Sequence, residues 1–123
     1  MRRYITVPLA AAAVLLSLAA CSAGGSAAGA VEVSADSIIL DVRTADEYAA
    51  GHLDGAQRLD FNAGEVAAAI PTLDPQAEYL VYCRSGNRAG QAIALMEQAG
   101  FTNVTNLGSL EQAAQATDIA IVR

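Results

Sequence analysis

The sequence predicts an α/β protein with a parallel β-sheet flanked by helices on both faces. The first observation is that short apolar, β-prone runs alternate along the chain with stretches of helical character. The second is that the runs at 38–42 and 79–82 are almost wholly apolar, as expected for parallel strands buried on both sides. The third is the length of 123 residues, which leaves room for one such domain.

The N-terminal segment differs in character from the rest of the chain. Two arginines follow Met1, and an uncharged, mostly apolar run extends from them to Ala20. This run is short for a membrane-spanning helix, which needs about 20 apolar residues. It ends in the sequence LAAC, which resembles a bacterial lipobox, so we expect a lipoprotein signal peptide at 1–20 and lipid on Cys21. An ordinary signal peptide and an uncleaved anchor are the alternatives, and each would export the domain.

The segment that follows contains only serine, alanine and glycine over residues 22–30. Such a composition cannot form a core, so we expect 21–30 to be a lipidated cysteine with a flexible tether and 31–123 to be the folded domain. The tether would span roughly 15–18 Å. The domain would therefore lie close to the cell membrane, on its extracytoplasmic side.

The charge of the chain limits its partners. The formal net charge is −6, and all seven basic residues are arginines. This acidity argues against nucleic acid and against peripheral binding to anionic lipid. Arg84 and Arg88 nevertheless lie together in one loop. A positive pocket on a negative body suits a small anionic substrate.

Cys83 stands between the expected strand at 79–82 and a helical stretch at 91–98. A tight loop in that setting directs backbone N–H groups and a helix N-terminus at one point, where an anion is stabilised. We therefore expect Cys83 to ionise more readily than a free cysteine and to act as a nucleophile. If Cys21 is lipidated, Cys83 has no disulfide partner, and an exported thiol without a partner is either used or inert and buried.

The other elements follow from local signals. Thr44 is a candidate N-cap, and Glu47 three residues later completes a capping box. Glycine or proline ends several of the segments. We expect the remaining helices at 45–50, 64–70 and 110–116, and the remaining strands at 56–59 and 101–106.

Four motifs resemble the single-domain rhodanese family, in the family's order and with its spacing. They are Asp41-Val42-Arg43-Thr44, Glu47-Tyr48, Gly51-His52-Leu53-Asp54-Gly55-Ala56 and Cys83-Arg84-Ser85-Gly86-Asn87-Arg88. The resemblance covers about 38–110, and the exported, compact form is similar to rhodaneses of the phage-shock-protein-E type. It implies a rhodanese-like fold.

The resemblance implies a thiosulfate sulfurtransferase. Cys83 would take a sulfane sulfur from thiosulfate or a similar anion, become a persulfide, and pass the sulfur to a thiophile such as cyanide, a small thiol or a protein thiol. The loop would hold the anionic species. Its binding residues would be Arg84, Ser85, Gly86, Asn87 and Arg88. No cofactor is implied, and one histidine with one usable cysteine cannot complete a zinc site.

Three further residues are expected to support the loop. Asp41 and Arg43 would brace the strand end, one near the loop and the other bonded to Glu47. His52 lies in a glycine-rich turn, and we interpret it as structural rather than as a base. The sequence departs from the family at Gly108-Ser109, where many members have two glycines followed by a tryptophan, and this chain has no tryptophan. One wall of the pocket is therefore expected to be shallow.

Two other functions remain open at this point. One is a persulfide carrier or redox-sensing module that binds without efficient turnover. The other is a cysteine phosphatase or arsenate reductase. Those enzymes have five residues between cysteine and arginine, whereas only Arg84 to Asn87 separate Cys83 from Arg88 here. A smaller ring of N–H donors favours a single sulfur atom over a tetrahedral oxyanion.

Overall fold

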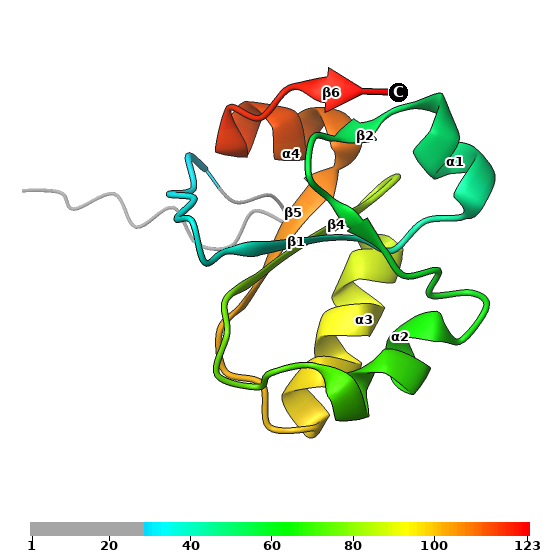
Figure 1. Cartoon of the computed structure of the whole chain (residues 1–123), viewed down its shortest axis with the longest axis vertical. Helices are drawn as coiled ribbons and strands as arrows, with labels where there is room; N and C mark the ends of the chain where they lie inside the picture. Colours follow the sequence, from blue (N-terminus) through cyan, green and yellow to red (C-terminus); the bar gives the residue numbers. More distant parts are fainter. Residues whose placement is uncertain (1–28) are drawn as a thin grey trace, which may run out of the picture.

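A computed structural model describes residues 29–123 and shows a parallel four-stranded sheet between two layers of helices (Figure 1). The sheet has the order β3-β1-β4-β5. Its strands are β3 (Gln57–Arg58), β1 (Ile38–Asp41), β4 (Tyr79–Cys83) and β5 (Val104–Ser109). All three pairings are parallel, which confirms the predicted fold class. The expected signal peptide and Cys21 lie outside the described residues, as does most of the expected tether.

The helices cover the sheet on both faces. They are α1 (Ala45–Ala50), α2 (Glu65–Ala69), the 3₁₀ helix η1 (Ile70–Thr72), α3 (Asn87–Gln98) and α4 (Leu110–Thr117). In Figure 1, α2 and α3 lie below the sheet and α4 lies above it. Two apolar clusters fill these layers: Met96 and Val66 belong to the lower one, and Leu107 and Ala113 to the upper one. The central strand β4 is buried along its whole length because both clusters pack against it.

A second, two-stranded sheet lies on the α4 side of the molecule. It joins β2 (His52–Leu53) to β6 (Ile121–Val122) in antiparallel register. Neither strand was expected from the sequence, because two residues are too few for the alternation that identifies a strand. The pairing holds the segment after α4 beside the turn that follows α1 (Figure 1).

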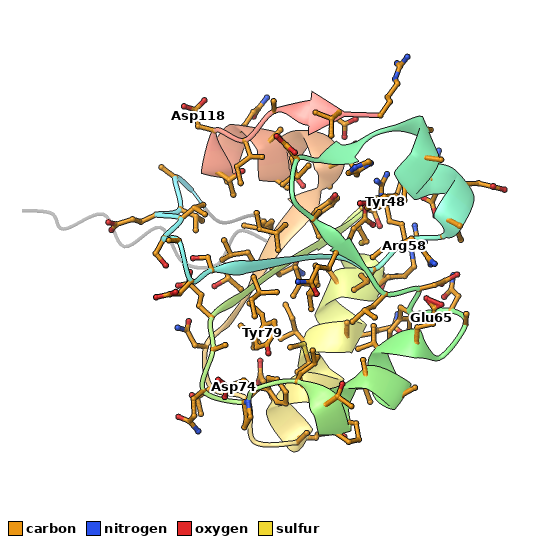
Figure 2. All side chains as sticks on the ribbon, in the orientation of Figure 1. Tyr48, Arg58, Glu65, Asp74, Tyr79 and Asp118 are labelled. Carbon is orange, nitrogen blue, oxygen red and sulfur yellow. The ribbon has the colours of Figure 1, made fainter. Side chains whose placement is uncertain are left out.

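Two polar contacts connect the loops of the lower helical layer to the sheet (Figure 2). Arg58 of β3 forms a 3.1 Å ion pair with Glu65 at the start of α2. The hydroxyl of Tyr79 donates a 2.9 Å hydrogen bond to the carbonyl of Asp74. These contacts tie the loops on either side of α2 to the sheet edge and to β4.

Several helices and strands have bounds that differ from the predicted ones. The prediction for 45–50 is confirmed, with the expected capping box between Thr44 and Glu47. The helix expected at 91–98 instead begins at Asn87, because Gly86 adopts a left-handed conformation that lets the helix start directly after it. The strand expected at 101–106 is shifted to 104–109. The helix expected at 64–70 is shorter and continues as η1.

The strand β5 contains a bulge beside the carboxyl end of β4. Val81 pairs with Asn106, but the next residue, Tyr82, pairs with Gly108. The extra residue, Leu107, is fully buried in the upper apolar cluster. Bulges of this kind redirect neighbouring side chains and are frequent beside active sites.

Within the described residues, no helix combines the length and apolar character needed to cross a membrane.

Candidate active site

Cys83 lies at the carboxyl end of β4, where the chain turns into α3. Its sulfur accepts a 2.9 Å hydrogen bond from the backbone N–H of Gly86 and a 3.5 Å contact from that of Ala89. Both donors belong to the loop and first turn that open α3, so a helix N-terminus faces the sulfur. Cys83 is buried and forms no disulfide within the described part of the chain. A negative sulfur is the species that this arrangement stabilises.

Gly86 is required by the shape of the loop. Its φ of 93° lies in the left-handed region, which other residues rarely adopt. A Cβ on Gly86 would also lie 3.3 Å from the Cα of Gly108 in β5. The loop therefore turns back toward the sulfur only because its backbone can approach β5 closely.

Asn106 holds the loop to β5, and the sequence analysis did not find it. Its side-chain amide donates a 3.0 Å hydrogen bond to the carbonyl of Gly86, and its side-chain oxygen accepts a 2.9 Å bond from the N–H of Gly108. One side chain thus links the bulge to the residue that donates to the sulfur. The available signal was an asparagine within the expected strand at 101–106, followed two residues later by glycine.

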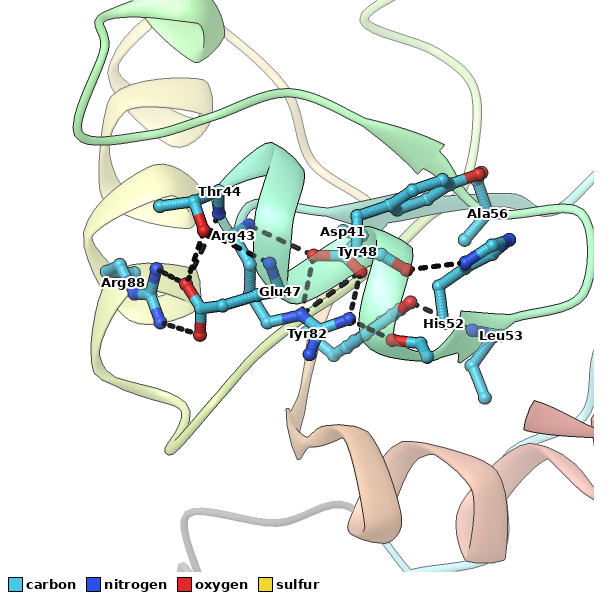
Figure 3. Close-up of polar contacts among 11 residues, drawn as sticks. Asp41, Arg43, Thr44, Glu47, Tyr48, His52, Leu53, Ala56, Tyr82 and Arg88 are labelled. Carbon is cyan, nitrogen blue, oxygen red and sulfur yellow. Dashed lines mark hydrogen bonds and ion pairs between the residues drawn. The ribbon is translucent and has the colours of Figure 1, made fainter. Parts of the chain in front are cut away.

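Arg88 and Glu47 form a two-pronged ion pair of 2.8 and 3.0 Å between α3 and α1 (Figure 3). The Arg88 hydrogen bond holds the pKa of Glu47 down at about 2, against an ordinary 4.5. The expected bond from Arg43 to Glu47 is wrong, because Arg88 and Thr44 occupy that carboxylate. Arg88 therefore anchors the loop, and its charge is balanced.

Asp41 and Arg43 form a buried pair of their own at the end of β1. Arg43 donates to both carboxylate oxygens of Asp41, at 2.7 to 3.1 Å, and to the carbonyl of Gly51 at 2.6 Å. Burial disfavours the guanidinium charge, yet the hydrogen bond and charge of Asp41 raise the pKa of Arg43 overall. The guanidinium also lies 5.5 Å from the ring centre of Tyr82. This pair ties the end of β1 to the turn after α1.

His52 contributes to the same turn. Its ring stacks on Tyr48 with centroids 3.7 Å apart, and its Nδ1 lies 2.8 Å from the Tyr48 carbonyl (Figure 3). The hydroxyl of Tyr82 accepts a 3.0 Å bond from the N–H of Leu53. These contacts fix the turn between α1 and β2, in keeping with the structural interpretation of His52.

The mouth of the loop is polar and open. Arg84, Ser85 and Asn87 are exposed, whereas Gly86 and Arg88 are half-buried. A groove of about 240 Å³ adjoins the loop, and its lining includes Arg84. It lies at the carboxyl ends of β1, β4 and β5, which is where ligands bind in open parallel sheets. The described residues contain no cluster of side chains that could hold a metal ion.

Comparison with known proteins identifies one family. The model of the rhodanese-like domain matches residues 26–116. The chain is 32% identical over 77 residues to the thiosulfate sulfurtransferase PspE of Escherichia coli, covering 61% of this chain and 72% of the relative. It is 39% identical over 70 residues to the thiosulfate sulfurtransferase GlpE of Pseudomonas entomophila, covering 57% of this chain and 62% of that relative.

Solved structures agree with this assignment of the fold. A rhodanese with anions from E. coli superposes with a TM-score of 0.61 at 29% identity, covering 71% of this chain and 98% of that one. The rhodanese-like domain of the Alr3790 protein from Anabaena superposes with a TM-score of 0.62 at 27% identity, covering 74% and 91%. The loop around Cys83 therefore lies within a fold shared along most of the described chain.

Proposed function

The chain belongs to the rhodanese-like domain family, and from that premise we propose that it is a sulfurtransferase in which Cys83 carries the sulfur. The observation that carries the proposal is the pair of backbone N–H groups of Gly86 and Ala89 directed at the Cys83 sulfur. The relatives named thiosulfate sulfurtransferases make thiosulfate the first donor to test.

In the first half-reaction, the Cys83 thiolate attacks the outer sulfur of thiosulfate. A new S–S bond forms, the bond within thiosulfate breaks, and sulfite leaves with the bonding electron pair. The product is a Cys83 persulfide, which is again an anion. The N–H donors and the start of α3 favour each negative species and need no general base.

The two loop arginines have different roles in this proposal. Arg88 is neutralised by Glu47, so it shapes the loop rather than adding net charge at its mouth. Arg84 is exposed at the mouth, and it supplies the positive charge that an incoming thiosulfate or a departing sulfite meets. Ser85 and Asn87 are also exposed there and are available to the same anions.

In the second half-reaction, a thiophile attacks the outer sulfur of the persulfide. Cyanide would become thiocyanate, and a thiol would become a persulfide of its own. In both cases the S–S bond to Cys83 breaks and the thiolate returns. No metal or cofactor enters either half-reaction.

The direct test uses the chain from Ser22 onward with thiosulfate and cyanide. We expect thiocyanate to form, and Cys83→Ser to abolish it while leaving the circular dichroism spectrum unchanged. Intact mass after thiosulfate alone should show the gain of one sulfur atom in the wild type and none in Cys83→Ser. Thiocyanate production equal to that of Cys83→Ser would reject the enzyme.

Intact mass and an assay of aryl phosphate hydrolysis separate the other two functions. A gain of one sulfur with negligible turnover would indicate a persulfide carrier, and oxygen additions on Cys83 would indicate a redox sensor. Hydrolysis of an aryl phosphate that depends on Cys83 would indicate a phosphatase. The ion pair between Arg88 and Glu47 weighs against the phosphatase, because the guanidinium is already engaged by a carboxylate.

A further inference from the structure

The groove beside the active-site loop is built by three neighbouring strand ends and α1. Arg43 follows β1, Arg84 follows β4, and Leu110 with Glu111 follow β5. Glu47 and Ala50 of α1 complete the lining. Its volume of about 240 Å³ is below the roughly 300–1,000 Å³ of pockets that take drug-sized ligands, so the groove has room only for a small molecule.

Two of the four charged residues in the groove already have partners. Arg43 is bonded to Asp41, and Glu47 is bonded to Arg88. Among the residues that the structure describes, neither Arg84 nor Glu111 takes part in an ion pair. The groove therefore offers one available cation and one available anion.

These two charges come from different elements and leave an apolar surface beside them. Arg84 belongs to the loop that carries the reacting sulfur, whereas Glu111 lies in the first turn of α4. Leu110 and Ala50 provide the uncharged part of the lining. A ligand that matches this lining has a carboxylate, an ammonium group and a short aliphatic chain.

On the basis of the proposed sulfur transfer, we propose that this groove is the acceptor site and takes a small thiol that carries both an ammonium and a carboxylate group, the chemical class of free cysteine. Arg84 would bind the carboxylate, Glu111 the ammonium, and Leu110 the methylene group. The acceptor thiolate attacks the outer sulfur of the Cys83 persulfide, the S–S bond to Cys83 breaks, and Cys83 leaves as a thiolate. The acceptor becomes a persulfide, with no other oxidant or reductant.

The test follows the discharge of the persulfide by four small thiols that carry both, one or neither of the two charged groups. The full chain is purified in detergent, loaded with thiosulfate, freed of excess donor and mixed with cysteine, cysteamine, 3-mercaptopropionate or 2-mercaptoethanol. Rate constants are corrected for the thiolate fraction of each thiol. We expect cysteine to react fastest and mercaptoethanol slowest.

Variants of Glu111 and Arg84 test which charged group of the acceptor each residue binds. Glu111→Gln should slow cysteine and cysteamine by about two- to fivefold, the range for one exposed charge contact, and leave mercaptopropionate and mercaptoethanol unchanged. Arg84→Gln should slow cysteine and mercaptopropionate. Glu97→Gln is the matched control, because it removes one exposed carboxylate on α3, away from the groove lining. Its rates should equal those of the wild type for all four thiols.

Two outcomes would overturn the proposal. One is a mercaptoethanol rate equal to that of cysteine in the wild type, and the other is the same pattern of rates in Glu111→Gln and Glu97→Gln. Formation of the persulfide with thiosulfate and its removal by cyanide are measured as well. These two measurements distinguish failure of the acceptor proposal from failure of the proposed sulfur transfer. If the persulfide forms and cyanide removes it, sulfur transfer stands even where the thiol preference does not; if no persulfide forms, the transfer itself fails.

Discussion

At the scale of single residues, the hydrogen bond to the Cys83 sulfur depends on the backbone of Gly86 and on the side chain of Asn106, which holds that backbone in place. The N–H of Gly86 faces the sulfur, and the carbonyl of the same residue is held by Asn106. A change at either position moves the donor without touching Cys83. Variants at these positions therefore separate loop geometry from overall stability.

Gly86→Ala should abolish most of the transfer activity. The new Cβ would meet Gly108 Cα at 3.3 Å, and the φ of 93° is strained for alanine. Gly55→Ala is the matched control, because Gly55 has a similar φ of 84° but nothing within 4 Å of its Cβ position. Urea unfolding should show losses of about 1–2 kcal/mol in both variants. Wild-type turnover in Gly86→Ala would show that the loop relaxes without cost to the reaction.

Asn106→Asp keeps the shape of the side chain and the acceptor for Gly108, but it loses the donor to the Gly86 carbonyl. Since one hydrogen bond contributes about 1 kcal/mol and two facing oxygens repel, we expect kcat/KM to fall about tenfold or more. Asn103→Asp adds the same charge at an exposed position before β5 and should react as the wild type. Equal rates in the two variants would exclude a positioning role for Asn106.

At the scale of elements, the ion pair between Glu47 and Arg88 ties α1 to the start of α3. The pair joins residues 41 positions apart, so it couples the first helix to the active-site loop. Because α1 is only six residues long, its position depends on this contact and on its capping box. The contact also makes the stability of the domain fall at acid pH.

Glu47→Gln removes the charge but keeps a capping side chain. The pKa of Glu47 is about 2 in the folded protein and 4.5 ordinarily, so its stabilisation is complete above pH 4.5 and disappears as the pH falls toward 2. We expect the variant to lose about 1–2 kcal/mol of unfolding free energy at pH 7, after discounting for the partly solvated pair. Asp46→Asn, an exposed change in the same helix, is the control. A deficit that stays constant down to pH 2.5 would contradict this assignment.

Elements with local signals could be predicted from the sequence, and long-range contacts could not. The strands around Leu40 and Val81 were identifiable because continuous apolar runs indicate buried parallel strands. The start of α3 was placed too late because its first residues, Asn87 to Gly90, are polar or small and show no apolar periodicity. The partner of Glu47 was assigned wrongly because Arg43 is near in sequence, whereas Arg88 approaches only after the sheet assembles.

At the scale of the whole molecule, the candidate active site lies at one edge of the sheet. The ends of β1, β4 and β5 contribute to the groove and the loop. Attachment of the domain to a membrane also belongs to this scale. We propose that it is held at the outer face of the cell membrane by lipid on Cys21.

Expression of the full chain in a bacterium tests this anchor. We expect incorporation of labelled palmitate and recovery in the membrane fraction. Cys21→Ala should lose the label, and this readout does not depend on whether the altered chain still reaches the membrane. A labelled Cys21→Ala protein, or an unlabelled wild type that is cut elsewhere near residue 21, would show that the chain is not a lipoprotein.

The enclosed sulfur has a practical consequence for anyone who counts thiols in this protein. Cys83 has no exposed surface, so a bulky aromatic disulfide dye has to wait for the loop to open before it can react. For the chain from Ser22 onward, which has one cysteine, such a dye should develop colour slowly in buffer and at once in guanidinium. A sample assayed without denaturant would therefore be mistaken for oxidised material.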